Sequence, residues 1–134
     1  MKRIFSAILI LVTIFAISCP AFAAEPRYAN ANTLTATMSI TSSGKASIFI
    51  RMSGSSSLTQ ANIKVYLEKK VGGTWTRVDI GTVNDVWEYT TTSSSVTKTY
   101  STQLSSTGNY RAVAVFTLSG STVEEITKTA TATY

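Results

Sequence analysis

The chain has 134 residues, 44% of them hydrophobic and 14% charged, with no histidine and a single cysteine. The absence of histidine removes the usual general base of a Ser-His-Asp triad and the commonest transition-metal ligand. The formal net charge is +5. Beyond the first few residues the basic side chains are scattered, with Lys69-Lys70 the longest run, so the charge pattern does not predict nucleic-acid binding.

The first 23 residues have the three parts of a secretory signal peptide. Lys2 and Arg3 supply the positive charge, residues 4–17 form an apolar run, and Ala21-Phe22-Ala23 gives an A-x-A cleavage site. We therefore predict that residues 1–23 are removed and that the mature chain, from residue 24, is exported from a bacterial cytoplasm as a secreted, extracellular protein. The apolar run is too short for a comfortable membrane span and no second one follows, so we expect no transmembrane segment in the mature chain.

Cys19 leaves an alternative open for the same segment. Ala16-Ile17-Ser18-Cys19 resembles a bacterial lipobox, which implies a lipidated N-terminus at Cys19. Ala16 stands where leucine is usual and Pro20 follows the cysteine directly, so A-x-A cleavage is the preferred hypothesis. A chain cut after residue 23 has no cysteine, and its stability must come from packing.

The mature chain is expected to contain a polar lead-in at residues 24–32 and one β domain at residues 33–134. Serine and threonine are abundant, and apolar residues alternate with polar ones at a period of two rather than 3.6. Turn-like clusters rich in Ser and Gly separate the alternating runs. We expect strands at 33–41, 45–52, 62–70, 74–81, 83–90, 96–104, 109–118 and 122–133. Seven or eight short strands predict an all-β, two-sheet antiparallel sandwich.

Gly72 and Gly73 mark the clearest local structure, a β-hairpin. Two glycines between strand-like runs supply the positive φ angles of a primed turn. The predicted register pairs Val71 with Thr74 and continues through the flanking residues. One face then holds the core residues Val65, Leu67, Val78 and Ile80, and the other holds Tyr66, Glu68, Lys70, Trp75, Arg77 and Asp79.

The segment Thr107-Gly108-Asn109-Tyr110-Arg111-Ala112 resembles the tyrosine corner of immunoglobulin-like domains. The resemblance implies an immunoglobulin-like sandwich in which the Tyr110 hydroxyl bonds to backbone. Ala112 stands where antibody domains have a cysteine, and the facing position is near Ile48 or Ile50, so no central disulfide is implied. The chain as a whole also resembles small secreted proteins of Gram-positive bacteria, which supports export and a single β domain but implies no site residues.

The outer-face aromatic residues are the candidate ligand-binding side chains. Tyr66 and Trp75 offer flat rings for stacking on sugars, and Arg77 and Arg111 offer hydrogen-bond donors. If the strand at 109–118 neighbours the hairpin, Val113 and Val115 add a partly apolar exposed patch. Alternatively, Trp75 only covers the hairpin. A second pair of rings, Trp87 and Tyr89, shares one face, and we expect at least one of the two to lie in the core.

Other chemistries have weaker support in the sequence. Several carboxylates are candidates for the acid pair of a glycosidase: Asp79, Asp85, Glu88, Glu124 and Glu125. Acidic side chains on polar strand faces also lie near one another by chance, so this support is weak. We expect no metal site and no cofactor, because there is no calcium-loop spacing and no phosphate-binding loop. The sequence predicts a non-catalytic extracellular module that binds a cell-surface glycan or protein. The alternative is a self-associating structural protein that uses an exposed edge strand at 127–134.

Overall fold

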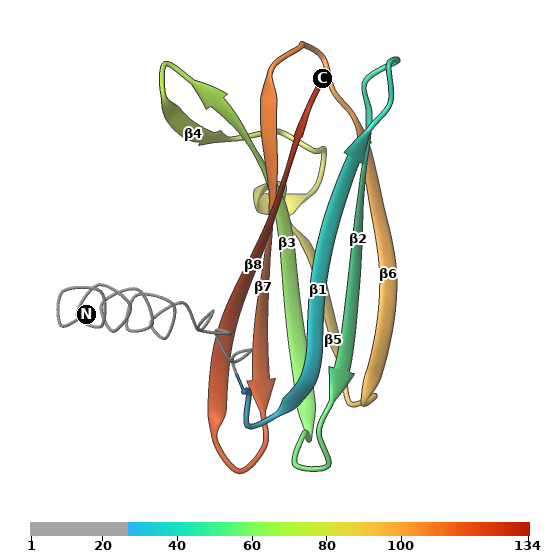
Figure 1. The fold of residues 1–134 in the computed structure, drawn as a ribbon, viewed down its shortest axis with the longest axis vertical. Coiled ribbons are helices and arrows are strands. Elements are labelled where there is room, and N and C mark those ends of the chain that lie inside the picture. Colours follow the sequence, from blue (N-terminus) through green and yellow to red (C-terminus); the bar gives the residue numbers. More distant parts are fainter. Residues whose placement is uncertain (1–26) are drawn as a thin grey trace, which may run out of the picture.

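The computed structural model describes residues 27–134, which form two antiparallel β-sheets packed face to face (Figure 1). The predicted signal peptide and Cys19 lie outside the described residues. The eight strands and one short 3₁₀ helix are β1 (Ala31–Ile40), β2 (Lys45–Gly54), β3 (Gln60–Val71), β4 (Thr74–Arg77), η1 (Val83–Asp85), β5 (Trp87–Thr91), β6 (Ser95–Gln103), β7 (Asn109–Ser119) and β8 (Val123–Thr133). The predicted all-β sandwich is confirmed.

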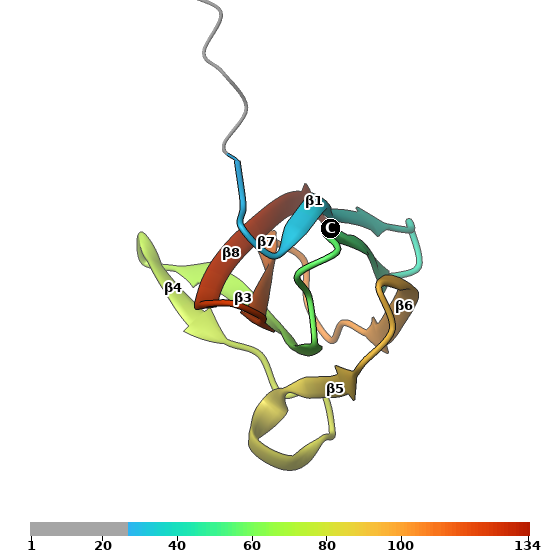
Figure 2. The same ribbon diagram turned by 90° about the horizontal axis from the view of Figure 1, so that it is seen from below.

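The strands divide into a three-stranded sheet and a five-stranded sheet. Sheet A has the order β1-β2-β6, and sheet B has the order β4-β3-β7-β8. β5 also belongs to sheet B, where it pairs with the first half of β3 while β4 pairs with the last residues of β3. Seen from below, β1 lies beside β8 on one side of the sandwich, and the chain passes from β5 to β6 on another (Figure 2).

Alternating side chains from β2, β3 and β7 fill the space between the sheets. Each of these strands sends every second residue inward, because successive side chains of a strand point to opposite faces. The innermost residues are at most 2% exposed: Ala46, Ile48, Ile50, Met52, Ala61, Ile63, Val65, Leu67, Tyr110, Ala112, Ala114, Phe116 and Leu118. Burying each of the large side chains contributes about 1.5–3 kcal/mol to folding. This core lies within residues 27–134, so a chain starting at residue 24 keeps the whole described sandwich.

The hairpin register predicted from the sequence is confirmed. Val71 pairs with Thr74 and Glu68 pairs with Arg77. Gly72 and Gly73 have φ values of 56° and 86°, the left-handed conformation that a primed turn requires at both positions. The Val78 amide donates to the Leu67 carbonyl at 2.9 Å, which continues the predicted pairing beyond the end of β4.

Two predicted strands are at least three residues longer than the observed ones. β4 ends at Arg77 rather than at residue 81, and β5 begins at Trp87 rather than at residue 83. Asn84 and Asp85 have positive φ values of 57° and 51°, which cannot continue a strand. Side chains hold this turn closed, because Asp85 Oδ1 accepts a hydrogen bond from the Ile80 amide at 3.2 Å. The predictions at these two strand ends were therefore wrong.

The last part of the polar lead-in is tied to the sandwich. Asn30 is fully buried, and its Nδ2 donates to the Thr122 carbonyl at 2.8 Å. The Glu124 carboxylate accepts hydrogen bonds from the amides of Ala29 and Asn30, each at 2.8 Å. These contacts fix the chain against the turn between β7 and β8, and β1 begins at Ala31, two residues before its predicted start.

Tyr110 makes the hydrogen bond that the tyrosine-corner resemblance implied. Its ring is 2% exposed, and its hydroxyl donates to the Ser106 carbonyl at 2.6 Å. The bond fixes the start of β7 to the loop that leads into it.

Candidate functional site

The outer face of sheet B brings together the four residues that the sequence singled out. Tyr66 comes from β3, Trp75 and Arg77 from β4, and Arg111 from β7. Glu68 is the centre of this group, because it is the register partner of Arg77 on one side and of Arg111 on the other. The pairing of β3 with both β4 and β7 therefore places side chains from three strands on one continuous surface.

Both aromatic rings of this surface are covered by guanidinium groups. The guanidinium carbon of Arg77 lies 3.4 Å from the ring centroid of Tyr66, and that of Arg111 lies 4.6 Å from the ring centroid of Trp75. Arg111 Nε also donates to Glu68 Oε2 at 2.6 Å. Each stacked pair contributes about 0.5–1 kcal/mol at an exposed site. The five side chains thus hold one another in place; we call them the stacked-arginine surface.

An apolar residue lies beneath the stacked-arginine surface. Val113 is the register partner of Tyr66 and points to the outer face, because Ala112 and Ala114 beside it point into the core. It is nevertheless only 4% exposed. The expectation that Val113 forms part of an exposed apolar patch was therefore wrong: outer-face side chains cover it, and what faces solvent is a layer of rings and charged groups.

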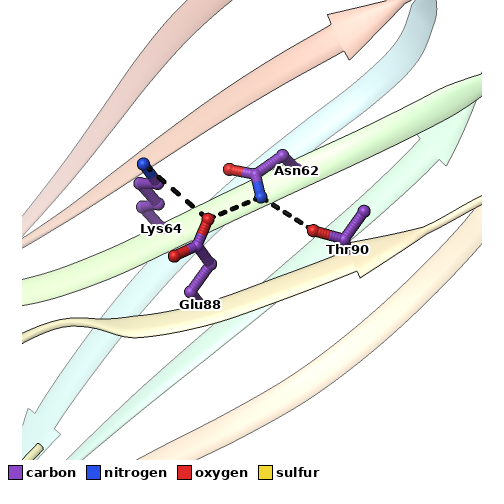
Figure 3. A network of polar contacts seen from close by, with 4 residues as sticks. All are labelled: Asn62, Lys64, Glu88 and Thr90. Atoms are coloured by element: carbon purple, nitrogen blue, oxygen red, sulfur yellow. Dashed lines mark hydrogen bonds and ion pairs between the residues drawn. The ribbon is translucent and has the colours of Figure 1, made fainter. Parts of the chain in front are cut away.

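A polar network continues the outer face of sheet B along β3 and β5 (Figure 3). Asn62 Nδ2 donates to Glu88 Oε1 and to Thr90 Oγ1, each at 2.8 Å, and Lys64 Nζ lies 3.7 Å from the same carboxylate oxygen. Lys64 and Glu88 are half-exposed, so their ion pair contributes less than about 1 kcal/mol. The network holds the short strand β5 against β3. The Glu88 carboxylate is therefore occupied by contacts that stabilise the sheet.

Three of the remaining candidate acids, Asp79, Asp85 and Glu124, also have local structural contacts. Asp79 Oδ1 accepts from the Gly81 amide at 2.8 Å, and Glu124 anchors the lead-in as described above. Within residues 27–134, no group of three or more Asp or Glu side chains is gathered closely enough to hold a metal ion. The same stretch contains no helix long and apolar enough to cross a membrane.

A second aromatic cluster closes the side of the sandwich between β5 and β6. The ring of Trp87 stacks on that of Tyr100 with centroids 5.2 Å apart, and Lys98 Nζ lies 3.8 Å from the ring centroid of Tyr89. Trp87 and Tyr89 both pack against the core, as predicted for at least one of them. Lys98 and Tyr100 were not among the predicted residues, although they alternate with exposed threonines and so share the inward face of β6.

The Tyr100 hydroxyl oxygen is buried and meets no hydrogen-bond partner among the described residues. Burial of the hydroxyl, and secondarily the nearby Tyr89, raises the pKa of Tyr100 above the ordinary 10.0. The Tyr100 ring packs against the core, and we expect the unpartnered hydroxyl to lower the stability of the native state.

The edge strand named in the self-association hypothesis is β8. It lies at the edge of sheet B and pairs with β7 along its whole length, from Val123 opposite Ser119 to Thr133 opposite Asn109. On its other side β1 lies beside it without pairing (Figure 2).

No protein-family model, curated protein or solved structure matches this chain, so the proposed function is based on the side chains themselves.

Proposed function

We propose that this protein is a secreted, non-catalytic recognition module that binds a cell-surface glycan or protein through the stacked-arginine surface of sheet B. The observation that carries the proposal is the convergence of Tyr66, Trp75, Arg77 and Arg111 in two cation–π stacks around Glu68. Tryptophan, tyrosine and arginine are the residue types that contribute most to binding energy in interfaces.

The stacks favour binding because they order long side chains before a partner arrives. A free arginine or tryptophan side chain loses about 0.5–1.5 kcal/mol of rotamer entropy when it is immobilised at an interface. Arg111 is held by both Glu68 and Trp75, so much of its rotamer entropy is already lost when the protein folds. The partner then meets a rigid surface with ring edges and guanidinium donors.

We also propose that the sandwich is immunoglobulin-like, as are many modules of cell surfaces. The order β1-β2-β6 and β4-β3-β7-β8 agrees with the arrangement of such domains, and Tyr110 lies at the start of β7, where a tyrosine corner belongs. The pairing of β5 with β3 departs from the constant-type arrangement, in which the corresponding strand joins the other sheet. The signal-peptide pattern of residues 1–23 supports an extracellular location for the mature chain.

The test is retention of residues 24–134 on immobilised cell-wall fractions and on a glycan and surface-protein panel. Trp75→Ala and Arg77→Ala are compared with Val123→Ser, a control at the far end of sheet B whose side chain is 72% exposed. We expect retention that is lost in the first two variants and kept in the control, with all three folded by circular dichroism. Retention that survives both Trp75→Ala and Arg77→Ala refutes the proposal.

Self-association is a second candidate, favoured by the length of β8. This edge strand has eleven residues and contains neither proline nor a bulge, which are features that normally protect an edge. Sedimentation velocity over a wide concentration range tests it: assembly that Thr129→Pro on β8 abolishes supports the hypothesis. A monomer at high concentration refutes it.

A further inference from the structure

The charged side chains of the sandwich are divided unequally between its two sheets. Sheet A carries three basic side chains, Lys45, Arg51 and Lys98, and its strands contain no aspartate or glutamate. Sheet B and the loops between its strands carry six basic and six acidic residues: Lys64, Lys69, Lys70, Arg77, Arg111 and Lys128 against Glu68, Asp79, Asp85, Glu88, Glu124 and Glu125. The side-chain charges of sheet B therefore cancel, while sheet A keeps a net charge of +3, of which Lys45 and Arg51 lie on its outer face and Lys98 on its inward face.

The outer face of sheet A has an ordered pattern along its central strand. Lys45, Phe49 and Arg51 project from β2 on the exposed side, and the Phe49 side chain is 37% exposed. From Lys45 to Arg51 the strand spans about 20 Å at 3.4 Å per residue. The Phe49 ring thus lies between the cations of Lys45 and Arg51, and this row is long enough to contact several units of an extended polymer.

Hydroxyl groups surround this line on both neighbouring strands. Thr37 and Thr99 flank Phe49, and Thr35 and Thr97 flank Arg51. Serines and threonines continue the pattern to both ends of the sheet: Thr33, Ser39, Ser47, Ser53, Ser95 and Ser101. These side chains can donate or accept hydrogen bonds without adding charge. The face is therefore rich in hydrogen-bonding groups and positive in charge.

Arg51 differs from the two arginines of the stacked-arginine surface. Arg77 and Arg111 stack on rings, and Arg111 is also paired with Glu68. Arg51 is exposed, and within residues 27–134 it has no ion pair, hydrogen bond or cation–π contact. Its five donors are available to an external carboxylate, which a guanidinium binds in bidentate geometry.

We propose that the outer face of sheet A binds an acidic polysaccharide. Arg51 and Lys45 bind carboxylates of the polymer, the Phe49 ring packs against a sugar ring between them, and the flanking threonines bond to sugar hydroxyls. The absence of side-chain carboxylates from β1, β2 and β6 removes the repulsion that a polyanion would otherwise meet. This site lies on the sheet opposite to the stacked-arginine surface and does not depend on the function proposed above.

The experiment is isothermal titration of residues 24–134 with polygalacturonate and, as a neutral match, with its fully methyl-esterified form. Titrations are made at low salt and at about 0.15 M salt, where the Debye length is about 8 Å. We expect binding to polygalacturonate that weakens with salt, and at least tenfold weaker binding to the ester. Arg51→Gln should lower the affinity about tenfold, as expected for a charge-assisted hydrogen bond of about 1.5 kcal/mol.

Two further variants separate the site from general charge and from the other sheet. Thr97→Glu places a carboxylate at the register partner of Arg51, keeps the arginine, and should reduce binding as strongly as Arg51→Gln. Lys64→Gln removes the same charge from sheet B, outside the stacked-arginine surface, and should leave the affinity within about twofold. Equal losses in Arg51→Gln and Lys64→Gln, or equal binding of the ester and the acid, overturn the proposal. Equal affinity for inorganic polyphosphate overturns the assignment to a polysaccharide.

Discussion

The same substitution, tyrosine to phenylalanine, should have opposite effects on stability at two positions of this sandwich. Tyr110 and Tyr100 each pack a ring against the core, and phenylalanine keeps that ring in place. Only the hydroxyl is lost. The Tyr110 hydroxyl donates to the Ser106 carbonyl at 2.6 Å, whereas the buried Tyr100 hydroxyl has no partner within the described chain.

The expected magnitudes follow from these contacts. Tyr110→Phe removes a short hydrogen bond and leaves the Ser106 carbonyl without this donor, which lowers the free energy of unfolding by about 1–2 kcal/mol. Tyr100→Phe removes a buried polar group that has lost its water, which raises the free energy of unfolding by about 1 kcal/mol. The stacking of Tyr100 on Trp87, with an interplanar angle of 14°, does not involve the hydroxyl and should persist.

Urea denaturation of residues 24–134 measures both effects. With a slope of about 1–2 kcal/mol/M, the midpoints of the two variants should lie about 1–3 M apart, on opposite sides of the parent midpoint. The slopes themselves should not change, since neither variant alters the area exposed on unfolding. Midpoints that shift in the same direction would refute the inference from hydrogen-bond partners, and an unchanged midpoint for Tyr110→Phe would remove the tyrosine-corner assignment.

Three further predictions test other parts of the structure. Above pH 10 the unfolded chain releases the Tyr100 proton before the native state does, because the native pKa is raised, so the free energy of unfolding should fall with rising pH; Tyr100→Phe should reduce that fall in urea titrations. Gly120→Ala should lower the thermal midpoint by several degrees, because the new methyl group meets Asn30 Oδ1 and the Ser57 carbonyl. Arg111→Gln should lower the free energy of unfolding by about 1–2 kcal/mol by urea denaturation, because it removes both the partly exposed pair with Glu68 and the stack on Trp75.

Local patterns in the amino-acid sequence are sufficient to predict much of this fold. The alternation around Gly72 and Gly73 fixes the hairpin register, because a two-residue turn allows only one pairing of its flanking strands. The ends of β4 and β5 are not predictable in the same way. Asp85 closes the turn between β4 and β5 by accepting a hydrogen bond from the Ile80 amide, and such a bond depends on a turn shape that alternation does not encode.

The candidate sites depend on strand pairing, which alternation alone does not predict. Alternation assigns each residue to one of two faces, so it correctly places Tyr66 and Trp75 together on the outer side of one hairpin. It does not say which strands share a sheet, and both sites require that information. Arg111 reaches the hairpin only because β7 pairs with β3 across a long stretch of sequence.

The charge difference between the sheets is hidden in the sequence for the same reason. β6 lies far along the chain from β1 and β2, and each of the three strands alone is an ordinary polar strand with few charges. Lys45 and Arg51 lie on the same strand, and pairing with β1 and β6 surrounds them with strands that contain no side-chain carboxylate, while the acids lie on β3, β5 and β8 and between β4 and β5. A near-even distribution of charge along a sequence is thus compatible with two faces of different charge. The net charge of a β-sandwich predicts its partners only after its strands have been assigned to sheets.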